Sequence, residues 1–267
     1  MTPDDRLDPF DRFAVQRPRG ADFHCRDLSV RIRPCPVVVA SGGVPDWSFT
    51  PVPAKPHGPA RRSRGMYPVR HPMPRGRVLV LTGGKVSSRQ SSRPWHLSRV
   101  RTAALAMSLR RRLGPERPIH HVHYRFRGWN SPELDALNDA DRVLRELTAH
   151  DDGRPTYLVG HSMGARVAAH LAAIHDIAGI VALAPWWPDH DTDFISAGCR
   201  VLVMHGTADR WTDPESARRQ VVRAQHRGLD ATWTAVPDAG HFMLHRPFDW
   251  HRRTAEFIAD TDDRRYV

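Results

Sequence analysis

A serine stands between two glycines where an apolar segment of this 267-residue chain changes its periodicity. Residues 156–159, TYLV, have the character of a short buried strand, and residues 165–173, ARVAAHLAA, are apolar at helical spacing. The residues between them, GHSMG at 160–164, must make a sharp turn from strand into helix. Side chains at its two glycines would collide with neighbouring elements, and Ser162 would hold its hydroxyl above the end of the strand. A turn of small residues chosen only for tight packing is the alternative interpretation.

Strand patterns alternate with helix patterns from residue 77 onward. The predicted strands are 77–84, 118–126, 156–159, 177–185, 199–206 and 230–240, and the predicted helices are 92–114, 131–150, 165–173, 213–228 and 241–260. The second helix is expected to begin with Ser131 as its N-cap and Pro132 at its first position. This alternation predicts an α/β fold, a mostly parallel sheet with helices on both faces.

Residues 1–74 differ from the rest, because proline, glycine and arginine are crowded there and periodicity is weak. We expect a loosely ordered arm over 1–74, with at most a hairpin on the sheet edge, and a folded α/β domain over 75–267. Met66 lies shortly before the first confident strand, and we expect a chain that begins there to fold. The apolar surface of the arm is too small to offset the entropy of ordering it.

The formal net charge of +11 raises the question of nucleic-acid binding. Nearly all the positive charge is arginine, since Lys55 and Lys85 are the only lysines, and such a bias is typical of a GC-rich genome. The basic residues are scattered, and the denser runs contain no interleaved aromatic residues for base stacking. We therefore expect a small-molecule substrate and no nucleic-acid partner. The sequence does not indicate an oligomeric state.

The sequence also shows no signal for membrane insertion or secretion. No run of about 18 apolar residues predicts a membrane span, and the N-terminus carries acids and no apolar core. The three cysteines, Cys25, Cys35 and Cys199, have neither metal-ligand spacing nor the density of a disulfide scaffold. These features favour a cytoplasmic protein.

Two further residues could make Ser162 reactive. A serine needs a base within hydrogen-bond reach and a carboxylate to hold the tautomer of that base. Asp209 follows the strand at 199–206, and His241 follows the strand at 230–240. Because parallel strands end at a common edge, we expect all three side chains to meet there. Asp238, in the same loop as His241, is the alternative acid and is the weaker candidate.

The region 77–258 resembles the α/β-hydrolase family. It carries GHSMG at 160–164, HGTAD at 205–209 and AGH at 239–241, in that order. The resemblance implies a serine hydrolase without a cofactor. Ser162 would attack a carbonyl, His241 would relay the proton, and Asp209 would orient His241.

The resemblance implies most directly an esterase or thioesterase that acts on a small to medium apolar acyl group. The same three residues could instead act on a peptide, a lactone or a carbon–carbon bond. A non-catalytic relative that binds a ligand or partner is a further alternative. A complete set of three reactive residues argues against that last interpretation.

Two departures from the family pattern concern the loops around the serine. The oxyanion hole is expected to use the backbone N–H of Met163 and that of Gly84, with Lys85, close to the substrate, as the alternative donor. The family usually has a His-Gly pair in that loop, where this chain has Thr82-Gly83. Many relatives carry D-x-R-G-x-G-x-S after the second strand, whereas RFRGWNSP at 125–132 lacks the acid and the second glycine.

The segment between the strands at 177–185 and 199–206 is too short for a large cap domain, so we expect an open site. Tryptophans follow several strands at the expected catalytic edge: Trp95, Trp129, Trp186, Trp187 and Trp211. One interpretation is an aromatic rim that binds the substrate's apolar acyl group. The other is that these rings only roof the sheet.

Other polar residues are assigned structural roles. His121 and His123 share one face of a strand, but no nearby acid or cysteine pattern supports a metal site. His161 is expected to pack beside the site and His205 to end a strand. Cys199 is expected to be a buried residue at the start of a strand.

Overall fold

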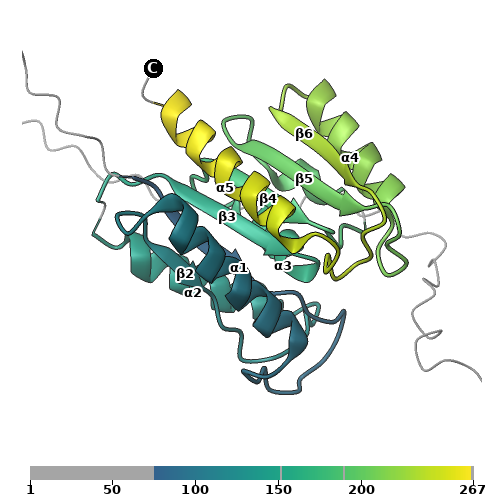
Figure 1. Ribbon diagram of the computed structural model, residues 1–267. Helices are drawn as coiled ribbons and strands as arrows, with labels where there is room; N and C mark the ends of the chain where they lie inside the picture. Colours follow the sequence, from purple (N-terminus) through teal and green to yellow (C-terminus); the bar gives the residue numbers. More distant parts are fainter. Residues whose placement is uncertain (1–74, 151, 189, 266–267) are drawn as a thin grey trace, which may run out of the picture. The chain divides into compact units, whose positions relative to one another are not determined.

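The computed structural model describes residues 75–150, 152–188 and 190–265, and the arm predicted at 1–74 lies outside this range. Six strands form one sheet in the order β2-β1-β3-β4-β5-β6 (Figure 1). They are β1 (Arg77–Leu81), β2 (Ile119–His121), β3 (Thr156–His161), β4 (Gly179–Leu183), β5 (Arg200–Gly206) and β6 (Ala231–Val236). Every neighbouring pair is parallel, as the alternating sequence pattern predicts.

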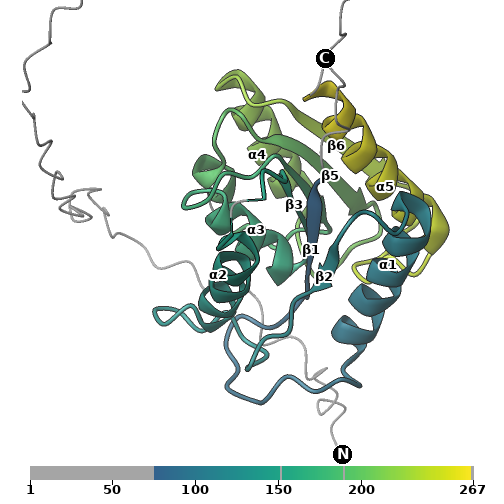
Figure 2. The ribbon, with the colours of Figure 1, turned by 90° about the vertical axis from the view of Figure 1, so that its left-hand side faces the viewer.

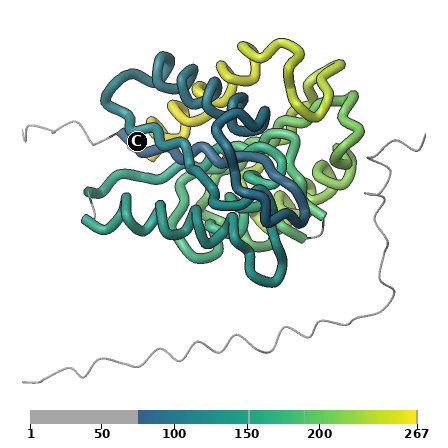
Figure 3. Tube along the Cα trace, turned by 90° about the horizontal axis from the view of Figure 1, so that it is seen from below, coloured from purple at the N-terminus to yellow at the C-terminus, as the bar shows by residue number. Residues whose placement is uncertain are grey.

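In the part of the chain that the structure describes, five α-helices cover the two faces of the sheet, which confirms the predicted fold class. They are α1 (Leu97–Leu113), α2 (Asp135–Thr148), α3 (Met163–Leu171), α4 (Pro214–His226) and α5 (Pro247–Arg264). Helices α1 and α5 pack together on one face, and α2, α3 and α4 lie on the other, as the views in Figures 2 and 3 show.

The core is split by the sheet into two apolar layers. Along β1, Val78 and Val80 face the layer under α1 and α5, while Leu79 and Leu81 face the layer under α2 and α3. Because both faces are covered, the central strands are continuously apolar instead of alternating with polar residues.

The strand order reverses next to β1. The chain runs from β1 outward to β2 and then returns to the other side of β1 to form β3. Ligands of open α/β sheets bind at the carboxyl ends of the strands where the order reverses. The loop after β1 and the turn after β3 meet at this place.

Several element boundaries differ from the prediction. Helix α1 begins at Leu97 and not at residue 92, and α5 begins at Pro247 and not at residue 241. Strand β2 ends at His121, and the segment beyond it pairs with the glycine loop: Lys85 N–H donates to Arg127 O, and Trp129 N–H donates to Lys85 O. Helix α2 begins at Asp135, not at Ser131 and Pro132. Leu134, with φ 54°, separates the turn at 131–133 from the helix, so Ser131 is not its N-cap.

The connection from β4 to β5 holds no large cap. In its described residues, the helical segment is a single 3₁₀ turn, η2 (Asp191–Phe194). Within the part of the chain that the structure covers, no helix combines the length and the apolar character that a membrane crossing requires.

Candidate active site

The turn from β3 into α3 holds Ser162 in an unusual backbone conformation, with φ 54° and ψ −116°. Its tightness explains both glycines. A Cβ at Gly160 would lie 2.3 Å from Gly164 O, and a Cβ at Gly164 would lie 2.3 Å from Leu81 O. Only glycine fits at these two positions, so strand, turn and helix can pack closely enough to present Ser162 at the sheet edge.

Three side chains from three different strand ends meet at this edge. His241 Nε2 lies 3.1 Å from Ser162 Oγ, and His241 Nδ1 lies 2.9 Å from Asp209 Oδ2. All three residues are buried. Such a chain of hydrogen bonds lets the imidazole accept the serine proton at Nε2 while Nδ1–H donates to the carboxylate.

Asp209 accepts more hydrogen bonds than the one from His241. The backbone N–H groups of Trp211 and Thr212 donate to Oδ1 at 2.8 and 3.1 Å. The Thr212 hydroxyl and His205 Nε2 lie 2.8 and 3.0 Å from Oδ2. His205 was expected only to end a strand, and Thr212 carried no sequence signal, so both contacts are new information from the structure.

These contacts keep the Asp209 carboxylate charged. Burial alone would raise the pKa of Asp209. The hydrogen bonds from His205 and His241, the charge of His241 and the Trp211 N–H together outweigh burial, and the pKa lies well below its usual range. Asp209 can therefore stabilise a positive charge on His241 throughout the physiological pH range.

His161 supports the site from inside the turn. Its Nε2 donates to the backbone oxygen of His241 at 2.9 Å, and the two rings are 5.1 Å apart. Burial, followed by the charge of His241, lowers the pKa of His161 to about 3. His161 is therefore neutral and holds the loop that carries His241.

Gly84 and Met163, the two residues expected to supply the oxyanion donors, are in contact through the Met163 side chain. A Cβ at Gly84 would lie 2.5 Å from Met163 Cε, so the glycine loop is in contact with the first residue of α3. Among the described residues, the N–H groups of Met163 and Gly84 donate to no other group. The Lys85 N–H donates to Arg127 O at 2.8 Å, so Lys85 is not available as the alternative donor.

The family model described as the alpha/beta hydrolase family matches residues 76–193, which include the glycine loop and the turn at Ser162. Over these residues the chain is similar to the α/β-hydrolase family. No curated protein matches the sequence.

Solved structures of α/β hydrolases share this fold. A lidless serine hydrolase, XC6422 from Xanthomonas campestris, has a TM-score of 0.55 and 18% identity over 75% of this chain and 86% of its own. Est1E from Butyrivibrio proteoclasticus has a TM-score of 0.54 and 13% identity over 73% of this chain and 91% of its own. Identities this low show a common fold, and the family supports a hydrolase without naming its substrate.

The tryptophans do not all lie on the rim of this site. Trp129 and Trp187 are each 3% exposed, and the Trp187 indole N–H donates to Ala165 O at 3.2 Å. Both rings belong to the apolar layer around α3, so the expected substrate contact of Trp129 and Trp187 is not found. Trp186 is partly buried next to the turn, with its N–H 3.2 Å from Ser162 O, and Trp211 is exposed.

Trp211 stands next to the His241 ring. The two rings are stacked, with centroids 6.0 Å apart and planes inclined by 17°. Trp95, 67% exposed, lies at the start of the segment that leads into α1, where Arg93 stands over its ring.

The other polar residues that the sequence singled out do not contact Ser162. Asp238 has an exposed side chain, and its N–H donates to Thr207 Oγ1, so Asp209 is the acid that contacts His241. His121 Nε2 is bonded to Thr102 Oγ1 at 2.8 Å. No group of three or more potential metal ligands occurs among the residues described. Burial raises the pKa of the Cys199 thiol to about 12.

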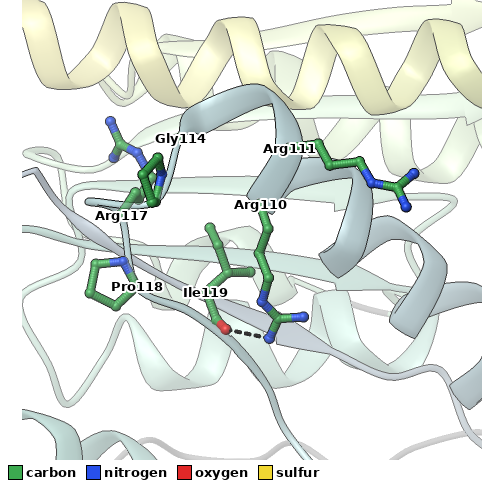
Figure 4. Close-up of a pocket in the computed structure, with 7 residues that line it drawn as sticks. Arg110, Arg111, Gly114, Arg117, Pro118 and Ile119 are labelled. Carbon is green, nitrogen blue, oxygen red and sulfur yellow. Dashed lines mark hydrogen bonds between the residues drawn. The ribbon is translucent and has the colours of Figure 1, made fainter.

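One surface cavity is remote from the serine. It has a volume of about 580 Å³ and is formed at the end of α1 and the start of β2, where Arg110 donates to Ile119 O (Figure 4). It lies at the amino ends of the strands, whereas Ser162 lies at the carboxyl ends. A smaller cavity adjoins His241.

Proposed function

We propose that this chain is a serine hydrolase that cleaves an ester or thioester of a small to medium apolar acyl group. Ser162 is the nucleophile, His241 the general base and acid, and Asp209 the residue that orients His241. The hydrogen-bonded series from Ser162 Oγ through His241 to Asp209 Oδ2, at 3.1 and 2.9 Å, carries this proposal.

The reaction proceeds through an acyl-enzyme. Ser162 Oγ attacks the carbonyl carbon and its proton passes to His241 Nε2. The bond to the leaving oxygen or sulfur then breaks, and His241 returns the proton to that atom. A water molecule, deprotonated by His241, attacks the acyl-enzyme and releases the acid.

Charge development at the carbonyl oxygen requires donors that are already in place. Gly84 is in contact with the Met163 side chain, and the N–H groups of both residues have no other described acceptor, which suits them to this task. The ionised Asp209 stabilises the imidazolium that forms on His241.

The proposed acyl group follows from the surroundings of Ser162. Trp186 adjoins the turn through its backbone and is only partly buried, and the short connection from β4 leaves the site open. The same three residues serve peptides, lactones or carbon–carbon bonds in principle, and a binding protein could share the fold. The labelling experiment below distinguishes these alternatives from the proposed function.

Labelling with a fluorophosphonate probe distinguishes the classes. The wild-type chain should take up one phosphonyl group on Ser162, and Ser162→Ala should take up none while its circular dichroism spectrum is unchanged. Hydrolysis of p-nitrophenyl butyrate should be lost in the same variant. A folded wild-type chain that is neither labelled nor active on esters would indicate a non-catalytic relative. Labelling without ester hydrolysis would point to another bond.

A further inference from the structure

A cavity of about 270 Å³ opens directly beside His241. Two loops form it, the one after β5 and the one after β6. Its walls include Trp211, His241, Phe242 and Leu244. Neither the glycine loop nor the start of α3 contributes a residue to it.

Aromatic rings surround the imidazole on the cavity side. Trp211 is stacked against His241, and the Phe242 ring meets it edge-on at 5.4 Å. The rings of Trp211 and Phe242 are 5.3 Å apart. Trp211 is 55% exposed and Leu244 is 67% exposed, so a large apolar surface stands open to solvent at this cavity.

The chemistry of His241 determines which half of a substrate reaches this cavity. After Ser162 has attacked, the proton held on His241 Nε2 must pass to the leaving oxygen or sulfur, which therefore lies within hydrogen-bond reach of Nε2. The carbonyl oxygen is directed instead to the N–H groups of Met163 and Gly84, which are not part of the cavity. The leaving group is thus the half of the substrate next to His241, which lines the cavity.

We propose that this cavity binds the leaving group and that the enzyme selects alcohols or thiols with an aromatic or other bulky apolar substituent. The proposal rests on the serine hydrolase function proposed above. Trp211 and Leu244 are then specificity-determining residues, because their exposed apolar surface is covered by the substituent. The leaving group departs as a neutral alcohol or thiol, carrying the proton that Ser162 gave to His241.

Benzyl acetate and methyl acetate test this assignment. The two esters form the same acetyl-enzyme, and their alcohols are of similar acidity, so the difference lies in how the leaving group is bound. Wild-type kcat/KM should be at least about tenfold higher for benzyl acetate, which corresponds to ~1.4 kcal/mol. Leu244→Ala and Trp211→Ala should each reduce this ratio.

The ratio is the readout, because Trp211 also contacts His241 and its loss can lower both rates together. Ile174→Ala is the matched control, since Ile174 is 55% exposed at the end of α3 and does not line the cavity. It should leave the ratio unchanged. A second pair, methyl phenylacetate and methyl acetate, varies the acyl group, and its ratio should be the same in wild type and Leu244→Ala.

Two outcomes would overturn the assignment. One is a benzyl-to-methyl ratio that is the same in wild type, Leu244→Ala and Trp211→Ala. The other is a change in the acyl ratio while the alcohol ratio is constant, which would make the cavity an acyl site. Both presuppose that Ser162 is labelled by fluorophosphonate, so failure of the hydrolase function itself is recognised separately by absence of the label.

Discussion

His205 Nε2 lies 3.0 Å from Asp209 Oδ2, so the carboxylate that contacts His241 is also bound by a second histidine. Both histidine contacts are to the same oxygen. His205 is 1% exposed at the end of β5, and its Nε2 lies within 3.1 Å of the Thr212 hydroxyl. We assign His205 as a positioning residue, which acts on the reaction through Asp209.

Substitution of His205 tests this role. His205→Leu removes a donor to a buried carboxylate, which should lower the free energy of unfolding by about 2 kcal/mol. It should also lower kcat roughly tenfold with little change in KM, because His241 is oriented less well. His205→Gln keeps a side-chain N–H and should recover part of kcat. Wild-type kcat in a folded His205→Leu variant would refute the positioning role.

The two glycines of the turn should tolerate no side chain. Gly164→Ala places a Cβ against Leu81 O, and Gly160→Ala places one against Gly164 O. Each should lower the free energy of unfolding by about 3 kcal/mol, measured by urea denaturation. Gly198→Ala is the control, because a Cβ there meets nothing within 4 Å. Equal stability of Gly164→Ala and Gly198→Ala would contradict the packing described for the turn.

Acid should destabilise this fold at unusually mild pH. Burial lowers the pKa of His161 to about 3 and, as the first cause, the pKa values of His121 and His251 to about 4. Between these values and about 6.5, the unfolded chain binds more protons than the folded chain, so stability falls as pH falls. Each histidine contributes up to ~1.4 kcal/mol per pH unit.

Urea denaturation at pH 7.5, 6.5 and 5.5 measures this dependence. The free energy of unfolding should decline slightly between pH 7.5 and 6.5 and more steeply between pH 6.5 and 5.5, and His251→Gln should make the decline less steep. The lowered pKa of Asp209 affects stability only at more acidic pH, because the stabilisation from its carboxylate is lost as pH falls below about 4. A free energy that is constant from pH 7.5 to 5.5 would show that these histidines are not buried in their neutral form.

Trp129 and Trp187 should contribute to stability and not to specificity. Both are buried beside α3, so Trp129→Ala or Trp187→Ala should cost about 3 to 5 kcal/mol of unfolding free energy. Trp95→Ala, at a ring that is 67% exposed, serves as the control and should cost little. A Trp187→Ala variant that is as stable as wild type but has an altered acyl preference would show that Trp187 contacts the substrate.

The placement of Ser162, Asp209 and His241 follows from sequence because it depends on the ends of parallel strands. Period and turn residues locate those ends, and the sheet then brings them to one edge. Which tryptophan rings are exposed and which are buried could not be predicted in this way. Whether a ring after a strand turns outward or packs on α3 depends on loop paths, and those are set by contacts such as Lys85 with Arg127.

The start of α2 shows the same limit. Ser131 and Pro132 satisfy the local rules for a helix N-terminus, but Asn130 Nδ2 donates to Asp135 Oδ2 at 2.8 Å and its Oδ1 accepts from Ser88 N–H. These contacts link the segment to the glycine loop, and the helix begins at Asp135. Tertiary hydrogen bonds from residues about forty positions away outweigh a local preference.

Combined substitution of Ser162 and His241 tests the central claim, that these residues act as one unit, most directly. Values of kcat/KM for p-nitrophenyl butyrate should be measured for Ser162→Ala, His241→Ala and the double variant, with folding checked by circular dichroism. Each single change should reduce kcat, and with it kcat/KM, by a factor of roughly 10⁴ to 10⁶. The double variant should lose no more activity than either single variant. A double variant whose loss is the product of the two single losses, or a Ser162→Ala variant with wild-type turnover, would contradict the account.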